Sequence, residues 1–590
     1  MKYCGPGFGY NGLSTITTAT LTTTSITAGQ IIASFAAASY RSANYVIQGV
    51  DATGTKYQTT NIIAIHNGSA ASFTEFGLRY LLANMAKHGS DELAKRTKLL
   101  EYTINRKIDE ISDDLLSNLK PASSGGVEII GFGVYIWNVR ETTELIRLIK
   151  TKSPKTIVVL GGPEVSHEVE SQEIVRISDY VIKGWGDVSF PKLCHDLTHG
   201  PKPIMKIIQG VQPELKEIEM PYKEFSDQDL AHRVLYVEAS RGCPFKCEFC
   251  LSSLDKTAWA FDSLRFLDEL NQLYERGARN FKFVDRTFNL KIEASIQILQ
   301  FFLDRIHQNG CEGLLIHFEV IPDNLPDKLK AVIAEFPKGI LQFEIGIQSF
   351  NEKVQELISR RQDNDKTEAN LRWLLAHSNA HLHTDLIFGL PGENIESFAK
   401  GFDRLLAIGP QEIQLGVLKR LRGTPISRHE QNFSMVFDAQ SPYMVKETKD
   451  LDSSTIVAFV KLAKYWDLIA NSGRFKSALS LILDSNHIKR SAFWSFYDLS
   501  DFLWRKTGRT FGLTPENLVD LIFDFLTINK SMDAEKVRQI LLADYLESGA
   551  RLRPICLAQE DLPLSGDRLS AKEGRNLKTS SLKARQDRHG

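Results

Sequence analysis

The chain has 590 residues, of which 43% are hydrophobic and 24% are charged, and its formal net charge is −1. This length exceeds what one hydrophobic core supports, so the composition predicts a soluble globular protein of roughly two to four domains. The near-zero charge argues against general electrostatic binding of nucleic acid, and no apolar run is long enough to span a bilayer.

The first sixty residues differ in composition from the rest. Thr15–Thr27 is a tract of threonine with alanine, serine and isoleucine, and Tyr45–Val50 alternates as a strand does. The segment carries few charges and resembles the β-rich repeats of phage structural proteins as far as Asn61–Gly68. We interpret residues 1–60 as an atypical β-rich segment, either a natural fusion or a foreign start, and expect it to contribute nothing to catalysis.

From Gly77 onward, strand-like and helical runs alternate, and Ile157–Leu160 is a continuous apolar run typical of a buried parallel strand. This alternation predicts a doubly wound, Rossmann-like domain over residues 61–200, with Asn61–Ile65 as its first strand and ligand loops at the strand ends. The strand-end loops are Tyr135–Asn138, Gly161–Ser166 and Gly184–Asp187. Paired glycines let the backbone approach a flat or anionic ligand, although a plain turn is the simpler interpretation of any one pair.

A segment rich in proline, lysine and glutamate, at residues 201–232, is interpreted as a linker. After the apolar run Val234–Val237, Cys243, Cys247 and Cys250 follow in C-x3-C-x2-C spacing. Three thiolates on one loop can hold three irons of a cubane cluster, and the missing fourth cysteine leaves one iron open. The alternatives are a zinc site completed by a distant histidine, or buried thiols without a metal. Seven cysteines and a start without the apolar core of a signal peptide fit a reducing cytoplasm.

Residues 233–440 alternate again, and six strand–helix units predict a partial (β/α)6 barrel of the TIM type, with its site at the carboxyl ends of the strands. Polar or turn-forming residues lie in or just after the expected strands: Asp285, Glu319, Glu344, Gln348, Asp385, Gly389 and Pro391. For each carboxylate taken alone, a helix cap or loop hydrogen bond is an equal alternative. Residues 441–590 are expected to form a helical domain with aromatic side chains in its core, and the basic tail Arg575–Gly590 is interpreted as a solvated, disordered end.

Three motifs together resemble the radical S-adenosylmethionine (SAM) superfamily: the cysteine loop, the E-x-G-x-Q-S run at Glu344–Ser349 and the G-L-P-G-E run at Gly389–Glu393. With the preceding glycine loops, the chain from Gly77 resembles a subfamily with a cobalamin-binding domain and a C-terminal domain of unknown function. The resemblance implies a [4Fe–4S] cluster, SAM bound at its open iron, and cobalamin. The D-x-H-x-x-G loop that supplies a cobalt ligand in many cobalamin domains is absent, and His66-Asn67-Gly68 has the wrong spacing. We therefore expect cobalamin to bind without a protein histidine ligand.

The resemblance also implies roles for individual residues. Asp285 takes the place that contacts the SAM amino group, and Arg360 or Arg361 meets the SAM carboxylate. The implied metal ligands are Cys243, Cys247 and Cys250. The implied cofactor-binding residues are Tyr135, Trp137, Asn138, Gly161, Gly162, Glu164, Ser166, Gly184, Gly186, Asp285, Glu319, Glu344, Gln348, Arg361, Asp385, Gly389 and Pro391.

These features predict a cytoplasmic enzyme that cleaves SAM reductively to a 5′-deoxyadenosyl radical and methylates an unactivated carbon. Its expected partners are an external one-electron reductant of the flavodoxin or ferredoxin type and an organic substrate, with no membrane and no general binding of nucleic acid. One alternative is a radical rearrangement or cyclisation without methyl transfer. Another is a non-catalytic metal-binding module inside a fusion protein.

Overall fold

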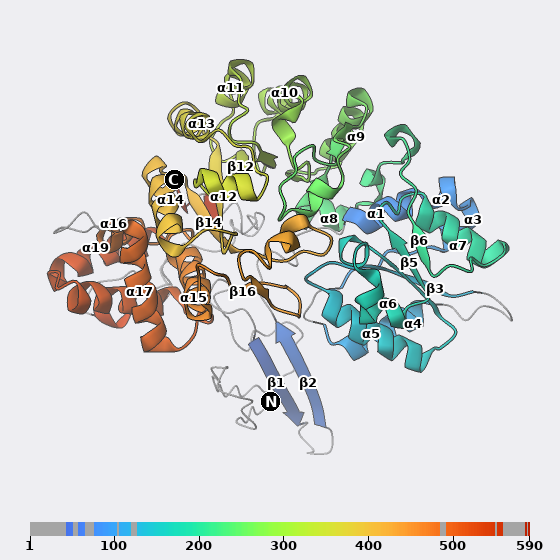
Figure 1. The fold of residues 1–590 in the computed structure, drawn as a ribbon, viewed down its shortest axis with the longest axis horizontal. Coiled ribbons are helices and arrows are strands. Elements are labelled where there is room, and N and C mark those ends of the chain that lie inside the picture. Colours follow the sequence, from blue (N-terminus) through green and yellow to red (C-terminus); the bar gives the residue numbers. More distant parts are fainter. Residues whose placement is uncertain are drawn as a thin grey trace.

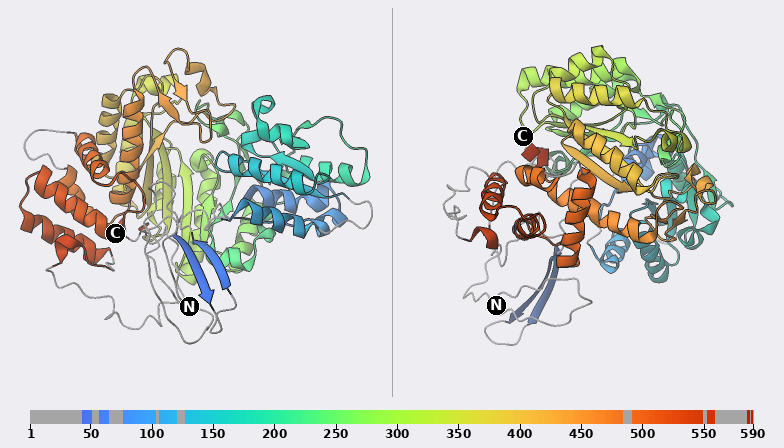
Figure 2. Two further views of the ribbon diagram at one scale, coloured as in Figure 1. Left: turned by 90° about the horizontal axis from the view of Figure 1, so that it is seen from below. Right: turned by 60° about the vertical axis from the view of Figure 1, so that its left-hand side comes forward.

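The computed structural model describes residues 43–50, 57–64, 76–102, 106–119, 127–483, 491–548, 552–558, 585–586 and 588–589, with the backbone alone for those before residue 65. An N-terminal α/β domain and a group of C-terminal helices lie on either side of a larger, half-open barrel (Figure 1). The views in Figure 2 show the same arrangement, with the barrel strands between the two flanking parts.

The N-terminal strands do not join either larger sheet. Strands β1 (Ala43–Val50) and β2 (Tyr57–Ala64) pair with each other in antiparallel register. This hairpin confirms the β-rich character predicted for the segment. The prediction that Asn61–Ile65 opens the sheet of the next domain is wrong, because residues 61–64 belong to β2. Cys4, the Thr15–Thr27 tract and His66 lie outside the described residues.

Four parallel strands form the sheet of the N-terminal α/β domain, in the order β3-β4-β5-β6. They are β3 (Ile129–Gly133), β4 (Ile157–Gly161), β5 (Tyr180–Lys183) and β6 (Ile207–Gln209). The last strand lies inside the predicted linker, so the sheet extends beyond the expected boundary at residue 200. Strand β6 has only three residues and lies among the prolines and charged residues of that segment, so it is not recognised as a strand from the sequence.

Helices cover both faces of this sheet, as the doubly wound prediction requires. Successive residues of β4 point to opposite faces, because side chains alternate along a strand. Val158 and Leu160 pack on one side with α4, α5 and α6, while Val159 packs on the other with Leu193 and Leu197 of α7. The helices are α4 (Ile108–Asn118), α5 (Val139–Lys152), α6 (Glu173–Ile177) and α7 (Ser189–His199). Short helices at the start of this region are α1 (Phe76–Ala83), α2 (Met85–His88) and α3 (Asp91–Arg96).

The barrel sheet has six parallel strands in the order β14-β13-β12-β11-β10-β7, which confirms the partial (β/α)6 prediction. The strands are β7 (Leu235–Val237), β10 (Asn280–Phe283), β11 (Leu315–Val320), β12 (Leu341–Gln348), β13 (His381–Phe388) and β14 (Glu412–Val417). The helices between or before them are α8 (Asp227–His232), α9 (Ser263–Glu275), α10 (Ile292–Asn309), α11 (Asp327–Ala334), α12 (Glu352–Leu357), α13 (Asn364–His377) and α14 (Ile395–Ile408). A small pair, β8 (Ser240–Arg241) and β9 (Trp259–Ala260), flanks the cysteine loop.

The C-terminal region begins with a small hairpin and continues as helices. The hairpin strands are β15 (Val436–Phe437) and β16 (Val445–Glu447), and the helices are α15 (Ser453–Ile469), α16 (Lys476–Leu483), α17 (Ala492–Thr507), α18 (Pro515–Asp524) and α19 (Ala534–Glu547). Among the aromatic side chains of these helices, Phe496 and Phe502 are buried in the core shared with the barrel, and Trp494, Tyr497 and Trp504 are half-buried against it. Among the described residues, none of the helices combines the length and the apolar character needed to cross a membrane.

The end of the chain corrects the interpretation of the basic tail as solvated. Arg585 lies 2.8 Å from both Glu412 and Asp467, and Gln586 Nε2 donates to Gln342 Oε1 at 2.9 Å. These contacts lie at the amino ends of β12 and β14. The described tail residues therefore close the end of the barrel that is opposite to the strand-end loops.

Stacking between Phe459 and Phe388 predicts how strongly the C-terminal helices are bound to the barrel. Phe459 on α15 is fully buried, and its ring lies 3.9 Å from that of Phe388 on β13 at an angle of 12°. Phe459→Ala should lower the free energy of unfolding by about 3–5 kcal/mol, because it leaves a cavity and removes aromatic contacts. Urea denaturation followed by fluorescence measures this loss. Val457→Ala is the control, since Val457 is 50% exposed on the same helix, and an equal loss there would contradict the prediction.

Candidate functional site

The strand-end loops of the N-terminal domain line a cavity of about 1700 Å³. Tyr135 and Trp137 follow β3, and their rings stack at 4.5 Å with an angle of 7°. Asn138 fixes this loop, because its side chain accepts from the Tyr135 N–H at 2.8 Å and donates to the Gly133 carbonyl at 3.0 Å. Trp137 is 65% exposed, so its ring is available to a ligand.

Glycines form the wall of the cavity beside this loop. Gly161 ends β4, and a Cβ added there would meet nothing within 4 Å, so the backbone faces open space. Gly162 has a φ of +104°, and a Cβ at that position would lie 2.6 Å from the Val134 carbonyl oxygen. Gly184 and Gly186 line the same cavity after β5. These glycines leave room for a large group to lie directly against the backbone.

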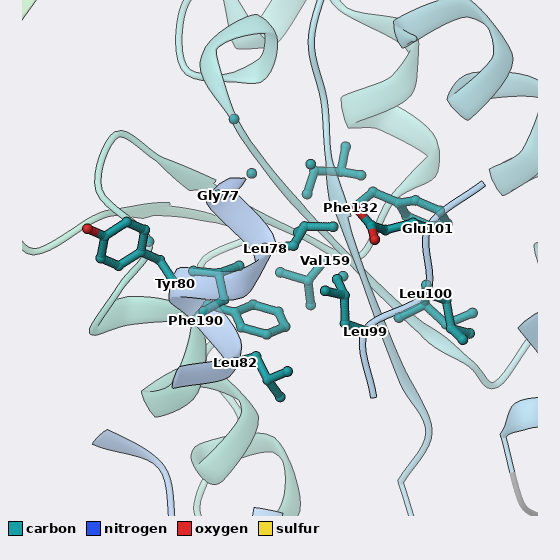
Figure 3. Close-up of a pocket in the computed structure, with 18 of the residues that line it drawn as sticks. Gly77, Leu78, Tyr80, Leu82, Leu99, Leu100, Glu101, Phe132, Val159 and Phe190 are labelled. Atoms are coloured by element: carbon teal, nitrogen blue, oxygen red, sulfur yellow. The ribbon is translucent and has the colours of Figure 1, made fainter. Parts of the chain in front are cut away.

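The far end of the cavity is apolar. Leu78, Leu82, Leu99, Leu100 and Phe190 surround it, together with Phe132 and Val159 of the sheet (Figure 3). A cavity of this size with apolar walls and a glycine-lined edge suits a large, partly planar ligand.

Two predicted cofactor-binding residues support the cavity without lining it. Ser166 is buried, donates to the Gly162 carbonyl at 2.8 Å and accepts from the Gly184 N–H at 3.0 Å, so it joins two of the strand-end loops. Glu164 is buried and is bound by Arg422 Nε at 2.8 Å and by the Tyr443 hydroxyl at 2.6 Å. Glu164 therefore connects the N-terminal domain with the region after β14.

This connection involves five side chains, which we call the interdomain latch: Glu164, Glu168, Arg420, Arg422 and Tyr443. Arg420 and Arg422 reach Glu168 at 3.2 Å and 3.1 Å. Arg422 also donates to the Tyr443 hydroxyl at 3.0 Å. Sequence reasoning missed the latch, because its partners lie more than 250 positions apart and form no local motif.

The cysteine loop begins directly after β8 of the barrel region. Gly242 has a φ of +85°, and a Cβ there would lie 2.5 Å from Thr257 Oγ1, which explains the glycine. The Cys243 N–H donates to the Asp255 carbonyl at 2.9 Å, and the Cys250 N–H donates to the Cys247 carbonyl at 3.1 Å. Cys243 and Cys247 are buried and Cys250 is half-buried. Burial raises the pKa of the Cys243 and Cys247 thiols, while the charge of Arg360 acts in the opposite direction on Cys247.

Within the part of the chain that the structure describes, no three Cys, His, Asp or Glu side chains converge on one point as ligands of a single ion would. A cubane cluster places each cysteine on a different iron, so its ligands surround a larger volume. The three cysteines lie on one short loop, as three ligands of a cubane would.

Arg241 joins the cysteine loop to the N-terminal domain. Its guanidinium binds Asp187 at 2.9 Å and 3.1 Å and Glu238 at 2.7 Å, and it lies over the rings of Tyr80 and Trp185. The Trp185 Nε1–H donates to Asp255 at 3.2 Å, which makes a second link to the loop. The cavity is lined by both sides of this junction, including Gly186, Asp187, Arg241 and Gly242.

At the carboxyl ends of the barrel strands, Asp285 is fully buried beside the cysteine loop. It accepts from the Ala239 N–H at 2.9 Å and from the Ser240 hydroxyl at 2.5 Å. Burial raises the pKa of Asp285 to about 7, against the effect of these two hydrogen bonds. Arg286 follows Asp285 and binds Glu319 at 2.9 Å.

The inner face of the barrel is polar. Glu344 Oε2 lies 3.1 Å from Lys282 Nζ and 3.0 Å from His317 Nε2. Burial would raise the pKa of Glu344, but the contact with His317 and the charge of Lys282 outweigh it and lower the pKa below its ordinary value. Burial and the negative charges of Glu344 and Glu319 raise the pKa of Asp385 well above its ordinary value.

Two buried acceptors on this face have no hydrogen-bond partner within the described structure: Asp385 Oδ1 and Gln348 Oε1. His383 Nε2 lies 3.4 Å from Asp385 Oδ1 without forming a hydrogen bond to it. Gln348 has a φ of +69°, a conformation that costs energy for any residue except glycine. Buried acceptors without donors are unfavourable, so this pair fits a ligand that donates hydrogen bonds.

Of the two candidate arginines, Arg360 and not Arg361 faces the cysteine loop. Arg360 Nη1 lies 3.7 Å from Cys247 Sγ, and its Nη2 donates to the Gly346 carbonyl. Arg361 is exposed and lines a surface groove with Arg404. The role given to Arg361 stays a prediction, and the geometry favours Arg360 for a group inside the barrel.

The G-L-P-G-E run turns the chain after β13. Gly389 has a φ of +89°, Pro391 is buried, and Glu393 accepts from the Ser349 hydroxyl at 2.7 Å. This hydrogen bond joins two of the recognised motifs. Gly389 and Pro391 therefore shape the strand-end backbone and place Glu393 against β12.

Three family models match successive parts of the chain. Residues 69–194 match the B12 binding domain, residues 237–405 match the radical SAM superfamily, and residues 431–581 match a protein of unknown function, DUF4080. The fold resembles that of the cobalamin-dependent S-adenosylmethionine radical enzyme OxsB with aqua-cobalamin bound. The TM-score is 0.55 at 14% identity, over 88% of this chain and 82% of that one.

Two curated relatives are methyltransferases. The 2-(S-pantetheinyl)-carbapenam-3-carboxylate methyltransferase of Streptantibioticus cattleyicolor is 24% identical over 48% of this chain and 46% of its own length. The cobalamin-dependent radical SAM methyltransferase TokK of Streptomyces tokunonensis is 24% identical over 52% of this chain and 49% of its own length. The chain thus spans about half the length of these relatives.

The buried Glu393 predicts a pH dependence of stability. Burial raises its pKa from 4.5 to about 7, against its hydrogen bonds from Ser349 and Ser397. The folded protein therefore holds this proton more tightly than the unfolded chain. As a result, the free energy of unfolding is highest below about pH 4.5 and decreases as the pH rises to about 7. Urea denaturation between pH 4.5 and 7.5 measures the effect. Over this range the free energy of unfolding of Glu393→Gln should rise by up to about 3 kcal/mol relative to that of the wild type. A constant difference across this range would contradict the prediction.

Proposed function

A radical SAM domain follows a B12-binding domain in this chain, and from this combination we propose a cobalamin-dependent radical SAM methyltransferase that acts on an unactivated carbon. The observation that carries the proposal is the single cavity lined by both domains. The strand-end glycines of the N-terminal sheet and the start of the cysteine loop share it, so two cofactors held at these edges would face each other. Ligand sites of open α/β sheets and of barrels lie at such edges.

The residues present fit the three groups. Cys243, Cys247 and Cys250 would hold the cluster, with Arg360 beside Cys247. SAM carries an amino group and ribose hydroxyls, and these donors suit the unpartnered oxygens of Asp385 and Gln348. Cobalamin would lie against the backbone of Gly161, Gly162, Gly184 and Gly186, and at Gly161 a side chain would extend into the space it needs.

The chemistry that these groups supply when bound is one-electron cleavage of SAM to a 5′-deoxyadenosyl radical and transfer of a methyl group to the substrate. The protein's own residues would bind and orient these groups and exclude water from them. Arg241 with Asp187 and Glu238 fixes the distance between the two edges of the cavity. The interdomain latch joins the segment after β4 to the region after β14.

Product analysis with SAM labelled in its methyl group tests the reaction class. Anaerobically reconstituted protein with reductant should form 5′-deoxyadenosine. When hydroxocobalamin is also present, it should in addition form S-adenosylhomocysteine, the product left when SAM gives up its methyl group. Formation of 5′-deoxyadenosine with no methyl transfer under any condition would favour the rearrangement alternative. The absence of both products would favour a non-catalytic module.

The three cysteines of the loop predict a specific pattern of iron loss. Reconstituted wild-type protein should contain about four irons per chain, as one cubane requires. Cys243→Ala, Cys247→Ala and Cys250→Ala should each lose the cluster absorbance and abolish SAM cleavage. Cys194, Cys311 and Cys556 lie outside the loop, so their alanine variants should keep both. Iron and sulfide analysis measures the outcome, and stoichiometric zinc with little iron would refute the cluster assignment.

The open space beside Gly161 predicts a variant that blocks cobalamin alone. Gly161→Leu should fold, because a Cβ there meets nothing within 4 Å, but its side chain would occupy the cavity. Affinity for hydroxocobalamin, followed by its visible spectrum, should fall at least ~10-fold, equivalent to about 1.4 kcal/mol. The iron content should remain that of the wild type.

Two further variants serve as controls for cobalamin binding. Gly200→Ala lies outside the cavity, after α7, and should bind normally. His66→Ala should also bind normally if no protein histidine ligates the cobalt. Loss of binding in His66→Ala would contradict the expectation of a ligand-free cobalt.

A further inference from the structure

Three arginines of the barrel region line the cavity that the two domains share: Arg233, Arg241 and Arg286. Two of them each bind a pair of carboxylates. Arg233 lies 2.7 Å from Glu101 and 2.8 Å from Asp229, and Arg241 binds one carboxylate of each domain. The side chains of Arg233 and Arg241 are 22% and 14% exposed. Both guanidinium groups are therefore occupied by the protein itself.

Arg286 has one carboxylate partner where each of the other two arginines has two. Its Nη1 donates to Glu319 Oε1 at 2.9 Å and to Oε2 at 3.2 Å, and neither Nε nor Nη2 donates a hydrogen bond to the described residues. The side chain is 52% exposed, whereas the neighbouring Asp285 and Thr287 are buried. Because Nε and Nη2 lie on the same edge of the guanidinium, a fork of two donors remains for a second carboxylate.

Arg286 lies just after β10, on the cavity side of the cysteine loop. Burial raises the pKa of the Cys243 thiol, and the positive charge of Arg286 acts on this thiol in the opposite direction. The residues proposed for SAM inside the barrel, Arg360, Gln348 and Asp385, do not line the cavity. Arg286 thus belongs to the shared space, where a substrate has to meet both cofactors.

We propose that Arg286 recognises the substrate and that the substrate carries a carboxylate, a proposal that rests on the proposed function. The planar fork of an arginine matches the two oxygens of a carboxylate, and the resulting charge-assisted hydrogen bonds fix the orientation of the bound acid. Glu319 holds Nη1, so the remaining edge of Arg286 is kept in one place. The carboxylate then decides which carbon of the substrate faces the cofactors.

The wall beside Arg286 indicates the rest of the substrate class. Val284 lies two positions before Arg286 and lines the cavity, as does Tyr236 on β7, the strand that pairs with β10. Ligand sites of this kind combine apolar walls with a few polar groups that fix orientation. An apolar or aromatic carboxylic acid therefore fits this part of the cavity, and benzoate is a suitable probe.

Binding of benzoate and of benzamide, its uncharged counterpart, tests the proposal. Both are titrated by saturation-transfer NMR into full-length protein that is loaded with its cluster, hydroxocobalamin and SAM. The wild type should bind benzoate at least ~10-fold more tightly than benzamide, and Arg286→Gln should remove this preference. Arg140→Gln is the control, because Arg140 is 77% exposed on α5 and does not line the cavity. It should keep the preference of the wild type.

Chemical modification of the wild type gives a second measurement that needs no variant to fold. Hydroxyphenylglyoxal should modify Arg286, and mass spectrometry of peptides locates the product. Benzoate should slow this modification, and benzamide should not. Arg241 is the internal control, since it is 14% exposed and bound by two carboxylates, and it should stay unmodified.

SAM also carries a carboxylate, so its affinity distinguishes the two sources. Arg286→Gln should bind SAM within ~2-fold of the wild type. A large loss of SAM affinity with an unchanged preference for benzoate would assign the guanidinium to SAM and overturn the proposal. A shifted midpoint potential of the cluster with an unchanged preference would assign it to the cluster, with the same consequence. Equal binding of benzoate and benzamide by the wild type, or modification of Arg286 that benzoate does not slow, would also overturn it.

Failure of the proposed function would look different. Iron content, the cobalamin spectrum and SAM cleavage are assayed in the wild type before any probe is added. A protein that lacks the cluster or does not cleave SAM would overturn the proposed function, and the role of Arg286 with it. A protein that has these properties but does not prefer benzoate would overturn the role of Arg286 alone.

Discussion

The arrangement of the whole site depends on the buried contacts of Arg241. Arg241 lies two residues before the first cysteine of the loop. Its guanidinium lies between Asp187 of the N-terminal domain and Glu238 of the barrel. A buried charge is tolerated only when it is paired and hydrogen-bonded, so these three groups hold one another in place. Because the arginine belongs to the barrel and one of its partners to the N-terminal sheet, its pairing fixes two edges of one cavity.

The polar inner face of the barrel has a related consequence. Lys282 donates a hydrogen bond to Glu344, whereas Asp385 and Gln348 each keep an oxygen without a donor. Such a site is less stable alone than with a ligand that supplies the donors. A ligand that donates hydrogen bonds would therefore stabilise the barrel. At the opposite end of the barrel, the tail residues Arg585 and Gln586 bind Glu412 and Gln342.

Local patterns in the sequence were sufficient for the regular elements and for the cysteine loop. The apolar run Ile157–Leu160 forms strand β4 (Ile157–Gly161) as predicted, because buried parallel strands leave a clear signature. The short strand β6 was missed, because three strand residues inside a segment rich in proline and charged residues look like a linker. The assignment of Asn61–Ile65 failed because a strand of a separate hairpin and a strand of a larger sheet can share the same sequence pattern.

Individual side-chain roles were harder to predict, because they depend on partners far along the chain. Glu164 looked like a ligand-binding residue at a strand end, but it is occupied by Arg422 and Tyr443. Choosing between Arg360 and Arg361 required the direction of each side chain, which adjacent positions in a sequence do not reveal. The motif glycines were more predictable, since a glycine is required wherever a Cβ would collide, as at Gly162 and Gly242.

The interdomain latch also imposes an order on synthesis. Glu164 is bound by Tyr443, which lies 279 positions later in the chain. At ~5–20 residues per second, the ribosome adds Tyr443 roughly 15–55 s after Glu164. For nearly all of that interval Glu164 lacks both of its latch partners. The N-terminal domain can therefore be fixed to the region after β14 only when all six barrel strands have been synthesised.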